Sequence, residues 1–322
     1  MRKMRVTIFI LGFLSIFLLG KIGMTADFPQ KPIRMIIPWG AGGGNDVTYR
    51  AAVQPAFEKI LGQRTIVENI GAGSTKVGTI ELMKAKPDGY TLGFTSTESW
   101  IGYYYSKTFD TKVWEQLTPI ASVTSQPYGY IEVRAESPFK TWADLVKAAK
   151  ENPGKLTCGA AGSGGMHELI VNDITKAAGI KVKYVPFAGS GGSKTALLGG
   201  HVDFRIGFPS DGIPLIRAGQ SRGLAVSADK RMEDMPDVPT FKELGVGEVI
   251  TVTRSIWGPP KLPSDLVDTI TKMVEKATKE PEFIKATQNL LEPVHYRSPR
   301  DFAVYLQNYD KEYGPKLTEM YK

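Results

Sequence analysis

The 322-residue sequence contains few of the residues that crosslink a chain or bind a metal. Cys158 is the only cysteine, so an internal disulfide is excluded and stability must come from buried apolar side chains. The three histidines, His167, His201 and His295, are scattered and do not form the ligand spacing of a metal site. We therefore expect no metal and no cofactor.

The sequence also lacks a strong excess of charge once its first residues are set aside. The formal net charge is +7, but residues 1–26 hold four basic side chains, Arg2, Lys3, Arg5 and Lys21, and no acidic one. Removing these four from +7 leaves +3 for the rest of the chain. A charge this small gives no electrostatic reason to expect binding to nucleic acid or to an anionic membrane.

The same N-terminal segment has the organisation of a secretory signal peptide. Its basic residues precede an apolar stretch at 6–20 and small residues at Thr25 and Ala26. The stretch is shorter than the ~20 apolar residues of a membrane-spanning helix. We predict a signal peptide at 1–26, cleaved after Thr25 or Ala26, and an exported mature protein. An uncleaved anchor is the alternative.

What the sequence does contain is a glycine-rich motif at residues 33–46. An apolar run at 35–37 predicts a buried strand that Pro38 ends, and four glycines follow within residues 40–44. Asn45 or Asp46 can cap a helix that begins near residue 47. A strand, a glycine loop and a helix N-terminus leave backbone N–H groups unpaired, and such groups favour an anion. A plain turn is the alternative interpretation.

Strands and helices alternate along the rest of the chain. The predicted strands are 65–68, 90–95, 130–134, 156–158, 182–187, 202–206 and 224–227. The predicted helices are 47–61 (kinked at Pro55), 71–84, 141–150, 194–198, 264–278 and segments beginning near 166, 281 and 299. This alternation indicates α/β units with doubly wound, mostly parallel sheets. Glycine loops recur at 159–165 and 188–193, so two lobes that face each other could clamp a small anion in a cleft.

Two catalytic interpretations of these glycine loops are rejected. Residues 161–165 resemble the nucleophile elbow of a serine hydrolase, but His167 follows Ser163 by four residues on the same helix and cannot serve as its base. Residues 188–195 resemble a phosphate-binding loop, but Ala188 and Ser193 replace the two glycines that define that motif.

Seven segments spread over the mature chain carry a resemblance to a known family. They are KPIR (31–34), PWGAGGGND (38–46), KPDGYTL (86–92), NPGKL (152–156), GGHVD (199–203), LAVS (224–227) and MPDVPTFKELG (235–245). Together and in this order they resemble the tripartite tricarboxylate transporter substrate-binding proteins (Bug-type receptors). The resemblance implies a two-lobed type II periplasmic-binding-protein fold. Lobe 1 is expected at 27–125 plus 226–322 and lobe 2 at 126–225, with a hinge near 122–128 and a return crossing within 224–257.

The resemblance also implies a function. We expect a periplasmic, non-enzymatic, monomeric receptor that holds a di-, tri- or aromatic carboxylate between its lobes and delivers it to the permease subunits of a tripartite membrane transporter. The expected ligand-binding residues are Trp39, Ala41, Gly42, Gly43, Asn45, Thr95, Ser96, Ser163, Gly164, Gly165, Gly207 and Arg254. A sensor that presents its ligand to a two-component receptor is the alternative, and a serine hydrolase is a remote one.

The sequence departs from this family at two places. Ile206, Gly207 and Phe208 replace a Phe-Asp-Asn that many members carry, which argues against an amino-acid ligand. Arg205 and Arg254 are additional cations, and we favour a solvated or salt-bridged arginine at each position over a contact with the carboxylate.

Overall fold

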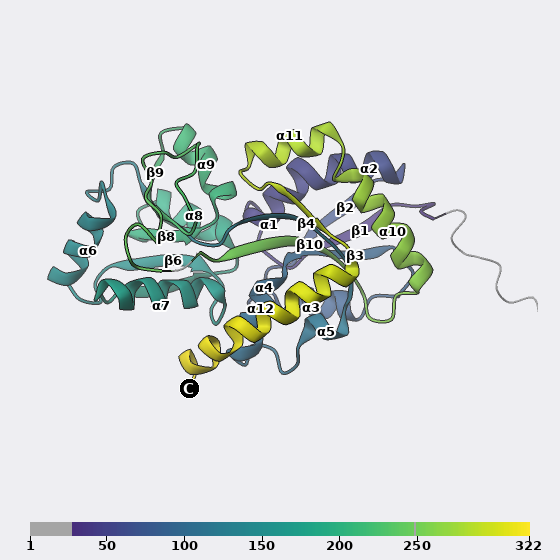
Figure 1. Ribbon diagram of the computed structural model, residues 1–322, viewed down its shortest axis with the longest axis horizontal. Helices are drawn as coiled ribbons and strands as arrows, with labels where there is room; N and C mark the ends of the chain where they lie inside the picture. The colour runs from purple at the N-terminus through teal and green to yellow at the C-terminus, as the bar shows by residue number, and fades with distance from the viewer. Residues whose placement is uncertain (1–27, 248) are drawn as a thin grey trace, which may run out of the picture.

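The computed structural model describes residues 28–247 and 249–322 (Figure 1). The predicted signal peptide at 1–26 lies outside the described residues. Within the described part of the chain, no helix combines the length and the apolar character that a membrane span requires.

The first sheet has six strands in the order β11-β4-β10-β3-β1-β2. They are β1 Ile33–Ile37, β2 Thr65–Asn69, β3 Thr91–Ser96, β4 Thr118–Pro127, β10 Thr251–Gly258 and β11 Val294–Arg297. β1 runs parallel to β2 and β3, whereas β10 is antiparallel to β3 and β4, and β11 is antiparallel to β4. The sheet is therefore parallel where strands and helices alternate, and antiparallel where β4 and β10 run toward the other lobe (Figure 1).

The second sheet has five strands in the order β7-β6-β8-β5-β9. They are β5 Tyr130–Arg134, β6 Thr157–Ala161, β7 Lys183–Phe187, β8 Phe204–Gly207 and β9 Ser221–Val226. β6 is parallel to β7 and β8, and β5 is antiparallel to β8 and β9. Two sheets built from separate parts of the chain, each with parallel strands, agree with the predicted two-lobed α/β class.

The outgoing and returning segments of the chain lie side by side where they pass between the two sheets. The Tyr128 N–H donates to the Ile250 carbonyl at 2.7 Å, and the Ser227 N–H donates to the Gly129 carbonyl at 2.8 Å. A second link comes from the C-terminal helix, because Asn172 lies 3.2 Å from the Met320 sulfur.

Helices cover both sheets (Figure 1). The helices are α1 Gly44–Thr48, α2 Gln54–Leu61, α3 Lys76–Met83, α4 Thr97–Tyr105, α5 Val113–Gln116, α6 Trp142–Glu151, α7 Met166–Ala178, α8 Ser190–Leu198, α9 Pro209–Arg217, α10 Ser264–Ala277, α11 Pro281–Asn289 and α12 Pro299–Met320. The core of the first lobe joins α4, β10 and α12. Trp100 meets Trp257 edge-on at 5.5 Å, and Trp257 packs on Phe302 at the same distance.

The first helix begins earlier than predicted. It starts at Gly44 rather than near residue 47, and Gly43 is its N-cap. The Asn45 side chain does not cap the helix, because its amide donates to the Ser96 hydroxyl at 3.0 Å. The irregularity expected at Pro55 is present as a π-helical turn at Tyr49–Val53, which is followed by α2 with its proline in the first turn.

Candidate functional site

Two glycine loops from opposite lobes touch each other. We call residues 39–45 the first glycine loop and residues 188–193 the third glycine loop. The Gly40 N–H donates to the Ala188 carbonyl at 3.4 Å, and a Cβ atom at Gly191 would lie only 2.3 Å from the Ala41 carbonyl oxygen. The Lys194 ammonium reaches the Gly42 carbonyl at 3.1 Å. The lobes must therefore part to admit a ligand here.

The first glycine loop presents N–H groups, and those of Gly40 and Gly42 are already occupied. The Gly42 N–H donates to Asp46 Oδ2 at 2.8 Å, and Asp46 also pairs with Arg50 at 2.7 Å. Gly42 has a φ of +71°, a conformation that favours glycine. Gly43 is extended at φ −84°, and the N–H groups that follow it form the first turn of α1, where no intrahelical acceptor exists.

The predicted residues Thr95 and Ser96 do not lie in a loop. They are the last two residues of β3 and are fully buried. Their hydroxyls form hydrogen bonds with side chains of the first glycine loop. The Trp39 indole N–H donates to Thr95 Oγ1 at 2.9 Å, and Asn45 and Ser96 exchange hydrogen bonds at 3.0 and 3.2 Å. Four of the predicted site residues thus form two buried hydrogen-bonded pairs that join the loop to β3.

Arg254 lies directly behind the start of α1. Its guanidinium pairs with Glu292 at 3.1 Å, donates to the Ser96 hydroxyl at 2.7 Å and stands 4.4 Å from the Phe208 ring. A Cβ atom at Gly44 would lie 2.5 Å from this guanidinium, so only glycine fits above it. Arg254 is fully buried and salt-bridged, which is the interpretation that the sequence favoured for it.

Glu292 connects this arginine to the other lobe. It accepts hydrogen bonds from Thr48 at 2.8 Å, Thr124 at 3.1 Å and Gln126 at 2.5 Å. The Gln126 amide also donates to the Ser210 hydroxyl of α9 at 3.1 Å. Buried polar groups of the first sheet and of helix α9 therefore share one hydrogen-bond network, which we call the Glu292 network.

The predicted residues Ser163, Gly164 and Gly165 lie in the opposing lobe but face a different loop. The Ser163 N–H donates to the Ser74 hydroxyl at 3.3 Å, in the loop before α3. The Gly164 N–H is taken by Glu168 at 2.7 Å. It is the third glycine loop, at Gly189 and Gly191, that faces the first one.

Gly207 packs against a second buried arginine. A Cβ atom at Gly207 would lie 2.7 Å from Arg205, whose guanidinium pairs with Glu132 at 2.6 Å and Asp211 at 2.8 Å. Burial alone would raise the pKa of Asp211, but its pairing with Arg205 lowers that pKa below the ordinary value. Arg205 is salt-bridged, again the interpretation that the sequence favoured.

Three ring side chains to which the sequence assigned no binding role pack on one another in the interior. Tyr128 and Phe208 both pack on His167, at 4.9 and 5.1 Å, and the His167 side chain is 2% exposed. Burial lowers the pKa of His167 to about 4, so the ring is neutral at pH 7. His167 follows a glycine loop by two residues, and this position is a signal that could have identified it as a residue near the loops.

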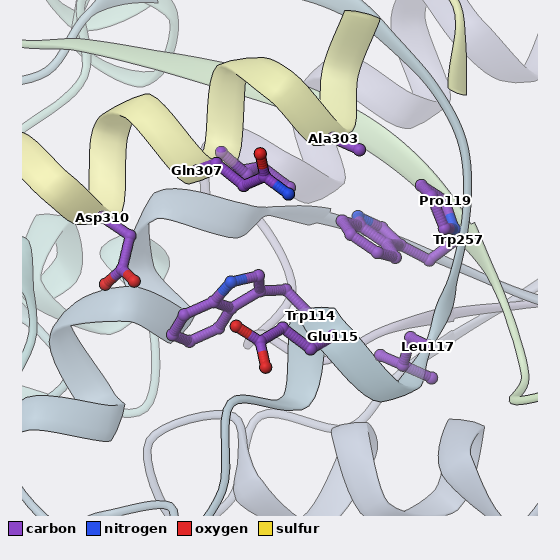
Figure 2. Close-up of a pocket in the computed structure, with 9 residues that line it drawn as sticks. Trp114, Glu115, Leu117, Pro119, Trp257, Ala303, Gln307 and Asp310 are labelled. Atoms are coloured by element: carbon purple, nitrogen blue, oxygen red, sulfur yellow. The ribbon is translucent and has the colours of Figure 1, made fainter. Parts of the chain in front are cut away.

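A separate pocket of about 330 Å³ lies beneath α12 (Figure 2). Trp114, Trp257 and Gln307 line it together with Glu115 and Asp310, and none of the predicted ligand-binding residues does. Its charged lining groups are two carboxylates, so it is poorly suited to an anion. Within residues 28–247 and 249–322, no cluster of three or more potential ligands is placed to hold a metal ion.

Comparisons with known proteins agree with this architecture. Residues 49–320 match the model of the tripartite tricarboxylate transporter family receptor. A Cupriavidus necator protein described as the UPF0065 protein in the gbd 5' region is 32% identical over 283 residues, which is 86% of this chain and 84% of that one.

Solved structures show the same fold. One described as a periplasmic transporter superposes with a TM-score of 0.83 at 26% identity and covers 91% of this chain and 97% of that one. MatC from Rhodopseudomonas palustris with bound malate superposes with a TM-score of 0.80 at 24% identity, over 92% of this chain and 100% of that one. The predicted fold class is thereby confirmed.

Proposed function

This chain belongs to the tripartite tricarboxylate transporter receptor family, and we propose that it is a periplasmic receptor that captures a small di-, tri- or aromatic carboxylate between its two lobes. It hands the bound acid to the permease subunits of a tripartite membrane transporter and does not transform it. We also propose that it acts as a monomer.

The observation that carries the proposal is the meeting of the first and third glycine loops. The N–H groups at the start of α1 face the N–H groups at the start of α8, and a Cβ atom at Gly43 would lie 3.4 Å from the Ser190 nitrogen. Two helix N-termini that converge from opposite lobes create positive potential. The Lys194 ammonium, which donates to the Gly42 carbonyl, adds to it, and both suit a carboxylate.

The buried arginines position the loops rather than bind the ligand. Arg254 and Arg205 are balanced by Glu292 and by the pair Glu132 and Asp211, so neither is a free counter-charge. Among the predicted residues we therefore assign the carboxylate to the amides of Gly43 and Asn45, with Trp39, Thr95, Ser96 and Arg254 as the support beneath them. The malate that MatC holds in the same fold is an acid of the proposed class.

A thermal-shift screen of mono-, di-, tricarboxylic and aromatic acids tests the proposal. A ligand that binds only the folded chain raises the melting temperature by mass action, so at least one acid is expected to stabilise the protein in proportion to its concentration. No shift with any acid would contradict the proposal. Uptake of the best acid by a strain that lacks this receptor then separates delivery from sensing. Unchanged uptake, together with loss of the cell's induced response to the acid, would favour the sensor.

A further inference from the structure

A second contact between the lobes joins α4 to the loop before α7. We call residues 162–165 the second glycine loop; it follows β6 of the second sheet, whereas α4 follows β3 of the first. A Cβ atom at Gly102 of α4 would lie 3.0 Å from the Gly165 Cα atom, and a Cβ atom at Gly165 would lie 2.8 Å from the Tyr103 ring. Backbone and ring therefore touch across the two lobes, with no room for a further side chain.

Tyr103 is the large side chain in this contact. It belongs to lobe 1, but its ring lies in a slot whose walls are Gly162 and Gly165 of lobe 2, and it is 1% exposed. A Cβ atom at Gly162 would overlap the Tyr103 hydroxyl, so a side chain on that wall would fill the slot. When the lobes part, the ring must leave the slot and part of its surface returns to water, which is unfavourable.

The same ring also contacts the first glycine loop. The Trp39 and Tyr103 rings pack with their centroids 6.2 Å apart, and the Trp39 indole is fixed by its hydrogen bond to Thr95. Tyr103 thus lies between the loop to which we assign the carboxylate and a loop of the opposing lobe. A change in how the lobes meet at this ring therefore acts on both sides of the cleft.

Resting on the proposed function, we propose that Tyr103 is a positioning residue for ligand capture: its ring docks in the second glycine loop, favours the closed arrangement of the lobes and raises the affinity for the acid without contacting it. The affinity of a receptor that holds its ligand in the closed state rises with the fraction of closed molecules. On this proposal Gly165, which the resemblance assigned to the ligand, is a wall of the slot.

Two variants of α4 disrupt this contact in different ways. Tyr103→Ala empties the slot, whereas Gly102→Leu places a good helix former against the backbone of the opposing loop. Each variant is expected to have a larger radius of gyration than the wild type in small-angle X-ray scattering without any acid. Each should also bind about ten-fold or more weakly in titration calorimetry, because its closed fraction is smaller. Succinate, citrate and benzoate are the probes, one from each proposed class of acid.

Two further variants serve as controls. Tyr103→Phe keeps the ring that fills the slot and is expected to match the wild type in both measurements. Tyr104→Ala removes the neighbouring ring on the same helix, which packs on Trp114 within the first lobe at 5.9 Å. It should leave the radius of gyration and the affinity unchanged. If Tyr103→Ala does not fold, Gly102→Leu carries the test, because it removes no buried side chain.

The possible results separate this inference from the proposed function. Equal radii of gyration in the wild type, Tyr103→Ala and Gly102→Leu would overturn the inference, and so would wild-type affinity in both variants. An effect of Tyr104→Ala as large as that of Tyr103→Ala would overturn it as well, because the loss would then come from α4 itself. Failure of the wild type to bind any of the three acids would contradict the proposed function, while the scattering comparison tests the contact without a ligand.

Discussion

Gly43 is the residue at which the proposed ligand and the opposing lobe meet. Its backbone is extended, so a side chain there meets no conformational penalty, but its Cβ atom would lie 3.4 and 3.5 Å from the nitrogens of Ser190 and Gly191. We expect Gly43→Val to fold normally and to lose about ten- to hundred-fold in affinity for the acid, because the valine methyl groups fill the space beside these N–H groups.

Gly219 provides the matched control for that substitution. It follows α9 with a φ of +67° and has open space around it, so Gly219→Val should cost roughly 1–2 kcal/mol of folding stability through backbone strain. Its affinity for the acid should be that of the wild type. Circular dichroism and titration calorimetry distinguish the two variants, and wild-type affinity in a folded Gly43→Val protein would place the site elsewhere.

His167 also makes a prediction about pH. Its folded pKa of about 4 is below the ordinary value of 6.5, so the unfolded chain binds the proton first as the pH falls. Stability is therefore expected to decrease between pH 6.5 and 4, by about 3 kcal/mol from this residue. The charged groups around it are Asp211, Arg205 and Arg254, and they remain in place when it is changed.

The measurement is the free energy of unfolding across this pH range for the wild type and His167→Phe. The variant should lose part of the pH dependence, whereas His201→Phe should keep it. Identical slopes in the wild type and His167→Phe would show that the imidazole takes up its proton equally in both states.

At the scale of secondary-structure elements, the Glu292 network joins β4, β10, α1 and α9. Glu292→Gln removes the charge that balances Arg254 and leaves a fully buried guanidinium without its counter-ion. We expect a loss of about 3–5 kcal/mol in stability. Denaturant unfolding measures this, with Glu282→Gln as the control, because that exposed partner of Lys59 should contribute far less. Equal losses in the two variants would contradict the role of the network.

Elements fixed by local chemistry could be predicted from the sequence, and elements with buried polar side chains could not. α6 follows from local chemistry, since Thr141 and Asp144 form the capping box that their spacing predicts. β4 and β10 were missed because polar residues such as Thr124, Gln126 and Arg254 interrupt their apolar pattern. Their partners come from distant parts of the chain, so no local pattern reveals that these polar side chains are buried.

The sequence also predicted only part of the candidate site. Glycine loops at the ends of strands could be located from residue types alone, and the resemblance assigned them to a carboxylate. Which loops face each other depends on how the lobes meet, so the pairing of Gly40 with Ala188 rather than with Ser163 was not predictable. Asn45 was expected to act as a helix cap or ligand contact, but its side chain does not cap the helix and instead bonds to Ser96.

At the scale of the whole molecule, two lobes close on each other through glycine loops while paired segments near Tyr128 and Ile250 connect them. The glycine loops pack backbone against backbone, but the buried apolar cluster is continuous from Trp257 of the first lobe to Phe204 of the second. The family match and this arrangement together support a receptor that opens, admits an acid and closes over it.

The most direct test of that claim is a calorimetric titration of the mature protein with the acid that stabilises it most, followed by analysis of the acid recovered from the cell. The account predicts one site per chain, saturable binding and recovery of the acid unchanged. Chemical conversion of the acid, or the absence of saturable binding, would contradict it.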